Sequence, residues 1–409
     1  MEVNNLIKKQ FYLKLYKKIF FKEKLFLPLL ISLFFILLSQ NNYLWVLTFG
    51  TFNVPPQQPA FSDFDSINNA LKSYKDGYNI YLYNPYDLHG YPFVYPKTWL
   101  VIFEYLNLNN NLIFLIFCFF LIYIYYFVLI KLFSFSLKSF KIIFLLFFFS
   151  TTNLLLIERL NTDLIIFILL YYVITNKNLF IKNFCFLFSV SLKVFPFFAI
   201  LVFIKKKIIL TIILSCFLLI FISKDIFLGN KNMIEYTLTF AYGSRTFSNS
   251  LFKILNYNNF PISRENYYYL LLIIIFILLI FFSFFFFRGI KNNLKYSKNL
   301  SEFFIVGSSI YLGTFILGSN IDYRLIFLTF TFPILFKNFE NISTKIFFIS
   351  SFISFYSIWF QYKPGGYLFI ITTLFIYLCK FYIFLFLSYK LGSALKNELI
   401  LYKKKSLFF

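Results

Sequence analysis

The chain has 409 residues, of which 60% are hydrophobic, 25% are aromatic and only 13% are charged. This small number of charged residues cannot cover the surface of a soluble protein of this size. The composition therefore excludes a soluble globular domain and indicates an integral membrane protein. The net charge of +23 comes from short basic runs between apolar segments. Such runs are typical of topogenic signals and of contacts with membrane lipids, and they argue against nucleic-acid binding.

Apolar stretches long enough to cross a bilayer as helices recur from residue 26 to residue 387. The lysine-rich segment 1–25 precedes the first of them and is predicted to lie in the cytoplasm. The loop 41–97 holds four aspartates and few lysines, so it is predicted to lie outside. Residues 26–390 would then form one transmembrane domain, and 391–409 a basic cytoplasmic tail.

One apolar stretch, 184–204, does not fit a simple alternation of sides, because lysines flank it at both ends. Pro196 in its middle lacks a backbone N–H and disfavours helix at the preceding residue. We therefore predict a helix that breaks near Lys193–Pro196 and returns to the same side, with Lys193 near the outer face. With this break, and with a second outer loop at 224–266, the sequence predicts an all-α polytopic membrane protein of about ten to eleven transmembrane helices.

The cysteine and histidine content restricts the chemistry. The four cysteines lie singly in apolar segments, with no paired spacing and no adjacent histidine, so neither disulfides nor a zinc site are expected. His89 is the single histidine of the chain, which argues against a multi-histidine metal site and a Ser-His-Asp triad. Catalysis would have to use carboxylates, lysine, arginine and tyrosine, with no metal.

The first outer loop contains the strongest candidate for a catalytic carboxylate. A short helix is predicted to start at Ser62, because Ser62 and Asp65 fit a capping box and apolar residues then repeat at helical spacing. The cap explains Asp65 but not Asp63, which lies at the positive end of the helix dipole, where the ionised form is favoured. An ionised carboxylate there can accept a proton from a hydroxyl nucleophile. The alternative is that both aspartates only favour the helix start.

Aromatic residues follow this helix, including Tyr81 and Tyr95. Rings at a membrane interface typically act as anchors, but their density here also suits stacking on a sugar or a polyprenyl chain.

A polar turn at 158–163 contains Glu158, Arg159, Asn161 and Asp163. Asn161 fits the N-cap of the following helix, with Asp163 in its first turn. No such structural explanation applies to Arg159.

Three cations, Arg159, Lys193 and Arg324, are predicted at one membrane level. Cations near an interface either extend into water or bind a lipid phosphate, for which arginine offers a bidentate fork. Their arrival from distant segments favours phosphate binding. Arg245 in the second outer loop is a weaker phosphate candidate.

In their order along the chain these motifs resemble glycosyltransferase family 87, whose members are membrane enzymes of the GT-C fold related to polyprenyl-phosphate-mannose-dependent mannosyltransferases. The resemblance covers about residues 26 to 340. It is carried by Asp63-Phe64, Gly77 to Tyr81, Tyr95-Pro96, Glu158-Arg159-x-Asn161-x-Asp163, Lys193-x-x-Pro196, Ser248-Asn249-Ser250 and Asp322-Tyr323-Arg324 with Pro333.

The resemblance implies an inverting transfer of a sugar, a hexose such as mannose, from a polyprenyl-phosphate donor to a lipid or glycan acceptor. The reaction would take place on the extracytoplasmic face of the plasma or inner membrane, with both termini in the cytoplasm and without a cofactor. The family's general base falls on Asp63, its lysine before a proline on Lys193, and its late Tyr-Arg pair on Tyr323 and Arg324.

We expect the donor phosphate to be bound by Lys193 and Arg324, together with Arg159. Residues expected to bind substrate or to support the site are Asp65, Tyr81, Tyr95, Glu158, Asn161, Asp163, Arg245, Asn249, Asp322 and Tyr323. Two alternatives remain. A transporter or flippase of a lipid-linked sugar needs polar residues near the middle of several spans. An oligosaccharide polymerase or ligase would share the outer arginines but need not share the Asp63 helix.

Overall fold

The computed structural model describes residues 25–88, 90–134, 140–203, 211–219, 241–257, 264–291, 298–318, 320–360 and 367–406. The predicted basic segment up to residue 24, His89, and the parts 224–240 and 258–263 of the second outer loop lie outside these ranges. The structure is about 80% helical and has one two-residue strand pair, which confirms the all-α class.

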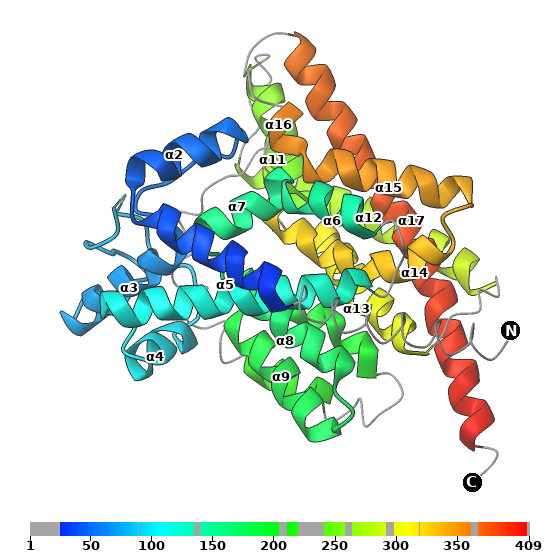
Figure 1. The fold of residues 1–409 in the computed structure, drawn as a ribbon. Helices are drawn as coiled ribbons and strands as arrows, with labels where there is room; N and C mark the ends of the chain where they lie inside the picture. Colours follow the sequence, from blue (N-terminus) through cyan, green and yellow to red (C-terminus); the bar gives the residue numbers. More distant parts are fainter. Residues whose placement is uncertain are drawn as a thin grey trace, which may run out of the picture.

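The first half of the chain supplies one end of the molecule (Figure 1). Its helices are Leu25–Ser39, α2 (Asn42–Thr51), α3 (Ser62–Lys75), α4 (Thr98–Tyr105), α5 (Asn111–Ser134), α6 (Phe140–Phe148), α7 (Thr151–Arg159), α8 (Asp163–Thr175), α9 (Leu179–Leu192) and the 3₁₀ helix η1 (Phe195–Phe203). The predicted outer loop 41–97 therefore contains two helices, α2 and α3.

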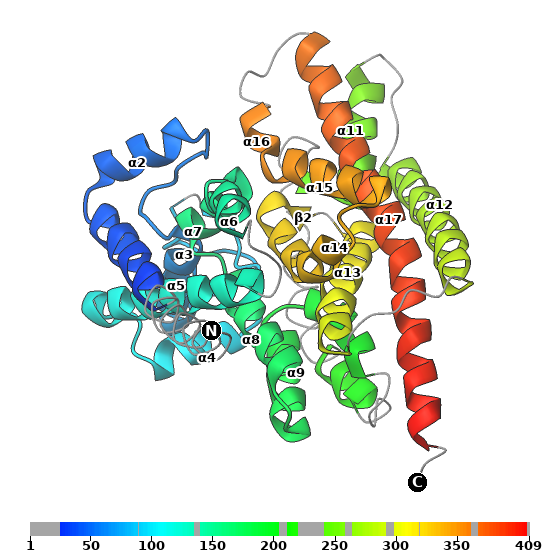
Figure 2. The ribbon, with the colours of Figure 1, turned by 45° about the vertical axis from the view of Figure 1, so that its right-hand side comes forward.

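The second half of the chain packs beside it (Figure 2). After a helix at 211–219, its elements are β1 (Ala241–Tyr242), α11 (Ser244–Tyr257), α12 (Arg264–Ile290), α13 (Lys298–Leu317), β2 (Asn320–Ile321), the 3₁₀ helix η3 (Asp322–Thr331), α14 (Phe332–Lys337), α15 (Ile342–Phe355), α16 (Ser357–Phe360) and α17 (Tyr367–Ser406). The strands β1 and β2 pair antiparallel, with Tyr242 opposite Asn320.

Three described helices are long and apolar enough to cross a membrane, which supports membrane association. They are α5, the segment Tyr267–Ile290 of α12 and the segment Ile371–Asn397 of α17. The helix Leu25–Ser39 and α2 pass the same test together, but a bend of 120° separates them.

The described residues thus hold fewer spans than the ten to eleven that the sequence predicts. The difference has a physical cause, because several apolar runs fold as helices of 10 to 17 residues. A straight helix needs about 20 residues to cross the hydrocarbon core. Those shorter helices are Asp163–Thr175, Leu179–Leu192, Ser301–Leu317 and Ile342–Phe355.

The break near Lys193–Pro196 is present. The helix α9 ends at Leu192, Lys193 has extended backbone angles, and the 3₁₀ helix η1 begins at Phe195. The Trp99 indole N–H on α4 donates to the Leu192 carbonyl at 3.1 Å, so α4, which directly follows the segment 41–97, is attached to the end of α9.

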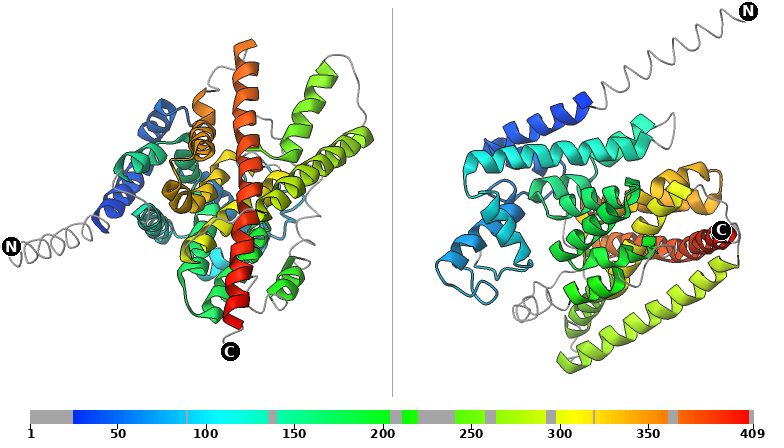
Figure 3. Two further views of the ribbon diagram at one scale, coloured as in Figure 1. Left: turned by 90° about the vertical axis from the view of Figure 1, so that its right-hand side faces the viewer. Right: turned by 90° about the horizontal axis from the view of Figure 1, so that it is seen from below.

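The long helices α12 and α17 cross at close range (Figure 3). A Cβ added at Gly289 would lie 1.9 Å from the Tyr389 carbonyl oxygen, and one added at Gly392 would lie 2.2 Å from that of Phe286. Glycines at both positions let the two backbones touch, as small residues do in membrane helix pairs. The contact makes α17 a fixed support for the elements that pack on it, which include α13 and α15.

Candidate functional site

The start of α3 is held by the polar turn of α7. The backbone N–H of Gln57 donates to Glu158 Oε1 at 2.7 Å, and that of Phe61 donates to the Glu158 carbonyl at 3.2 Å. Glu158 is fully buried. These bonds place Asp63, in the first turn of α3, against the α7–α8 turn.

The predicted capping box at this helix start is wrong, although the helix does begin at Ser62. Its N-cap residue is Phe61, which has a left-handed backbone (φ 64°) and makes no side-chain cap. The Ser62 hydroxyl donates instead to Gln57 Oε1 at 2.7 Å, and Asp65 accepts from the Asn69 amide at 2.9 Å. The loop attachment to Glu158, rather than a cap, therefore fixes where α3 starts.

Asp63 is joined to the rest of the site through Asn161. The Asn161 amide Nδ2 donates to Asp63 Oδ2, and Asn161 Oδ1 accepts from the Asp163 backbone N–H at 3.0 Å. Thr162, rather than Asn161, is the N-cap residue of α8. The other carboxylate oxygen of Asp63 has no hydrogen-bond donor among the residues that the structure describes, and the side chain is partly exposed.

The pKa of the Asp63 carboxyl lies above its usual value. Removal from water is the largest cause, whereas Arg159, the hydrogen bond from Asn161, and Lys193 all act in the opposite direction. The sequence-based expectation, in which the helix dipole favours the ionised form, omitted this desolvation. A carboxyl with a raised pKa is a stronger base once it is ionised.

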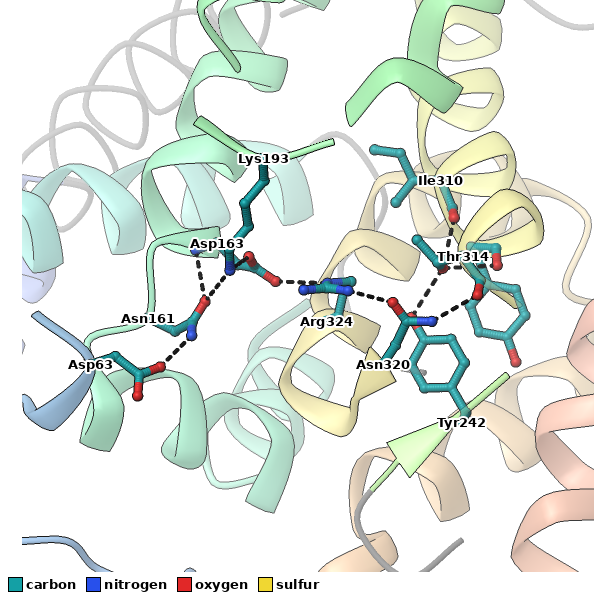
Figure 4. A network of polar contacts seen from close by, with 10 residues as sticks. Asp63, Asn161, Asp163, Lys193, Tyr242, Ile310, Thr314, Asn320 and Arg324 are labelled. Carbon is teal, nitrogen blue, oxygen red and sulfur yellow. Dashed lines mark hydrogen bonds and ion pairs between the residues drawn. The ribbon is translucent and has the colours of Figure 1, made fainter. Parts of the chain in front are cut away.

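Asp163 holds two of the predicted cations, one on each oxygen (Figure 4). Lys193 Nζ lies 2.5 Å from Asp163 Oδ1 and 3.0 Å from Asn161 Oδ1, and Arg324 Nε lies 3.1 Å from Asp163 Oδ2. The Asp163 side chain is completely buried, whereas those of Lys193 and Arg324 remain 11% and 15% exposed. The buried carboxylate therefore holds both cations and leaves part of each accessible.

Arg324 continues the network toward the second half of the chain. Its Nη1 donates to Asn320 Oδ1, and Asn320 Nδ2 donates to the Thr314 carbonyl at 2.7 Å. The Tyr242 hydroxyl lies 3.3 Å from the Thr314 hydroxyl. Figure 4 follows this sequence of contacts from Asp63 to Tyr242.

Aromatic rings lie against both cations. The Lys193 ammonium lies 5.3 Å from the ring centre of Tyr95, and the Arg324 guanidinium carbon lies 4.3 Å from that of Phe195. Both distances fall within cation–π range. The Tyr81 hydroxyl donates to the Tyr95 carbonyl at 3.2 Å. Tyr81 therefore helps to hold Tyr95, whose ring lies beside Lys193.

Arg159 occupies a neighbouring position. Its Nε lies 2.8 Å from Glu158 Oε2, its Nη1 lies 3.5 Å from the Ser62 hydroxyl, and its Nη2 lies 3.2 Å from the Pro55 carbonyl. Arg159 thus lies beside the start of α3, near Asp63, and does not share Asp163 as a counter-ion with Lys193 and Arg324. All three predicted cations therefore surround the Asp63–Asn161–Asp163 line, but only two share a counter-ion.

The remaining predicted residues make their contacts elsewhere. Asp322 pairs with Lys380, Asp65 with Asn69, and Asn249 accepts from the Tyr267 hydroxyl. Tyr323 is buried and Arg245 is exposed. A sequence neighbour of a site residue is therefore not always part of the site.

The sequence reasoning missed Asn320 and Lys380. Asn320 is four residues before Arg324, and Lys380 interrupts an otherwise apolar run, which is itself a signal of a buried partner.

In the part of the chain that the structure describes, no group of three or more His, Cys, Asp or Glu side chains is arranged to bind a metal ion. Comparison with known proteins found no family model that matches this chain, no similar curated protein and no similar solved structure.

Proposed function

We propose that this chain is a membrane-bound inverting glycosyltransferase. It would move a sugar, a hexose such as mannose, from a polyprenyl-phosphate donor to a lipid or glycan acceptor. The observation that carries the proposal is the continuous network from Asp63 through Asn161 to Lys193, Asp163 and Arg324. It joins a carboxylate with one open oxygen to two partly exposed cations.

The proposed reaction is a single displacement. Asp63 takes the proton of the acceptor hydroxyl while the acceptor oxygen bonds to the anomeric carbon from the face opposite the phosphate. The bond between the anomeric carbon and the phosphate oxygen breaks, and its electron pair leaves with the polyprenyl phosphate. Attack from the opposite face inverts the anomeric centre. Preorganised cations that meet the departing charge are often the largest catalytic contribution.

Lys193 and Arg324 keep hydrogen-bond donors for a phosphate although both contact Asp163. An ammonium has three N–H donors and a guanidinium has five. Lys193 uses two on Asp163 and Asn161, and Arg324 uses Nε on Asp163 and Nη1 on Asn320. Among the described residues, Arg324 Nη2 has no hydrogen-bond acceptor. This spare donor capacity supports a phosphate beside the two cations.

The proposed setting is a GT-C-like multi-pass fold in the plasma or inner membrane, with cytoplasmic termini and an extracytoplasmic site. The three long apolar helices and the shorter apolar helices beside them support a membrane fold. The lysine-rich terminal segments support the orientation.

The transporter alternative requires charged residues along a water-filled path within the spans. Lys380 and Asp322 form a charged pair inside the molecule, but both side chains are fully buried against their neighbours. This pair therefore does not favour a transport path.

The test uses purified protein, a panel of labelled polyprenyl-phosphate sugars and membrane extract, with identification of the glycosylated product. Asp63→Asn should lower turnover by about 10²- to 10⁴-fold, the usual contribution of a general base. Asp65→Asn is the matched control, because it makes the same chemical change on the same helix at a residue that bonds to Asn69. Turnover by Asp63→Asn at the control's level, or no transfer from any donor by the unmodified protein, would contradict the proposal.

A further inference from the structure

A buried ion pair lies between α17 and η3, outside the network just described. Lys380 Nζ lies 2.7 Å from Asp322 Oδ1 and 2.9 Å from Asp322 Oδ2, and neither side chain has any exposed area. The Ser357 hydroxyl also donates to Asp322 Oδ2. Lys380 belongs to the segment of α17 that is long and apolar enough to cross a membrane.

Such a pair needs an explanation other than stability. The cost of removing two charges from water offsets most of their attraction, so an apolar pair of similar volume is often equally stable. An ion pair instead fixes the relative position of the two segments that carry it, because the two side chains must lie within hydrogen-bond distance of each other.

The contact of Lys380 with Asp322 affects the orientation of Arg324. Lys380 Nζ lies 3.5 Å from the Ala241 carbonyl and also pairs with Asp322, so it contacts the start of β1 and the start of η3 together. Asn320, just before Asp322, is held in the strand pair opposite Tyr242. Residues two positions apart on a 3₁₀ helix of about three residues per turn point in different directions. Anchoring Asp322 on α17 therefore leaves Arg324 to face Asp163.

We propose that Lys380 is a positioning residue for the donor-phosphate site. It anchors Asp322 and thereby fixes the segment 320–324 that presents Arg324 to the phosphate. The inference rests on the proposed function, since it assigns a task to that same site. It predicts that the pair affects donor binding more than it affects folding.

The test replaces both partners, so that no unpaired charge is left buried. Asp322→Asn with Lys380→Met should fold, and should raise the donor KM about tenfold, as expected for the loss of one charge-assisted hydrogen bond to the phosphate. The change in kcat should be smaller. Binding of polyprenyl phosphate alone to the full-length protein should weaken by a similar factor.

The chain offers a matched control in a second ion pair, which is largely buried. Lys182 Nζ on α9 lies 2.9 Å from Glu302 Oε2, with side chains 6% and 16% exposed. Lys182 is about 15 Å along α9 from Leu192, the residue before Lys193, at 1.5 Å per residue. Lys182→Met with Glu302→Gln makes the same chemical changes there. It should leave the donor KM and the affinity for polyprenyl phosphate unchanged.

A smaller change guards against a double variant that does not fold. Ser357→Ala removes one hydroxyl that bonds to Asp322, and it should raise the donor KM about two- to fivefold. Donor KM and polyprenyl-phosphate affinity equal to those of the unmodified protein, in a folded double variant or in Ser357→Ala, would overturn the assignment. Binding of polyprenyl phosphate without transfer of any sugar would contradict the proposed reaction. The binding measurements on the variants would still test the positioning role of Lys380. Absence of both binding and transfer in the unmodified protein would overturn both.

Discussion

Replacing Asn161 with alanine separates Asp63 from the cation pair. The Asn161 amide donates to Asp63 Oδ2, and its oxygen accepts from Lys193 Nζ at 3.0 Å. Lys193 stays in place without this contact, because Asp163 holds it at 2.5 Å. The main electrostatic consequence falls on Asp63, which loses a donor that favours its ionised form.

The size of the effect follows from that one bond. A hydrogen bond to a charged group contributes about 1.5–3 kcal/mol. The pKa of Asp63 is already raised, and the Asn161 bond is among the contacts that restrain the rise, so its loss raises the pKa further. A general base acts when it is deprotonated, so activity falls as the pH drops through its pKa. In Asn161→Ala the acid limb of kcat/KM should move to higher pH. Well below the limb, kcat/KM should be about 10- to 150-fold lower, at 1.36 kcal/mol per tenfold.

The measurement is the pH dependence of kcat/KM for sugar transfer. Asn69→Ala is the control, because it removes the same type of amide bond from Asp65, on the same helix, at 2.9 Å. Its profile should match that of the unmodified protein. An acid limb of Asn161→Ala that stays in place or moves to lower pH would refute the assignment of Asp63 as the base.

Two further predictions concern the supports of the cations. Arg324→Lys should raise the donor KM about tenfold, because a single ammonium cannot replace the guanidinium fork that bonds to both Asp163 and Asn320. Initial rates at varied donor concentration measure this KM, and an unchanged value would contradict the prediction. Trp99→Phe should lower the free energy of unfolding by about 1–3 kcal/mol, because the Leu192 carbonyl loses its indole donor. Thermal unfolding in detergent measures the second effect, with Trp359→Phe, at a ring that is 41% exposed, as a control that should change little.

Features encoded by local chemistry could be predicted from the sequence. The break after α9 follows from Pro196 and from the lysines on both flanks, and the structure has it at Lys193. The predicted start of α3 at Ser62 is confirmed, although the capping box on which that prediction relied is absent. The expected membrane topology, which orders segments by depth, predicts that Arg159, Lys193 and Arg324 group near Asp63.

Features decided by distant partners could not be predicted. Ser62 bonds to Gln57 rather than capping α3, because Glu158, 101 residues from Gln57, fixes the preceding loop. The motif Asp322-Tyr323-Arg324 groups Asp322 with Arg324, yet Asp322 bonds to Lys380, 58 residues away. The described residues hold fewer spans than predicted because apolar composition alone does not show where a run folds as a helix too short to cross a bilayer, as Leu179–Leu192 does with 14 residues.

The charge distribution of the site agrees with the direction of the proposed reaction. Three cations, Arg159, Lys193 and Arg324, face three carboxylates, Asp63, Glu158 and Asp163, so the resting cluster is balanced when all are ionised. In the proposed reaction, transfer would neutralise Asp63 and add one negative charge to the departing phosphate. Negative charge thus moves from the Asp63 end of the network toward the end where Lys193 and Arg324 keep spare donors. Because the departing phosphate would carry one more negative charge than the bound donor, the cations would stabilise it more than they stabilise the donor, which is the condition for lowering the barrier rather than only tightening binding.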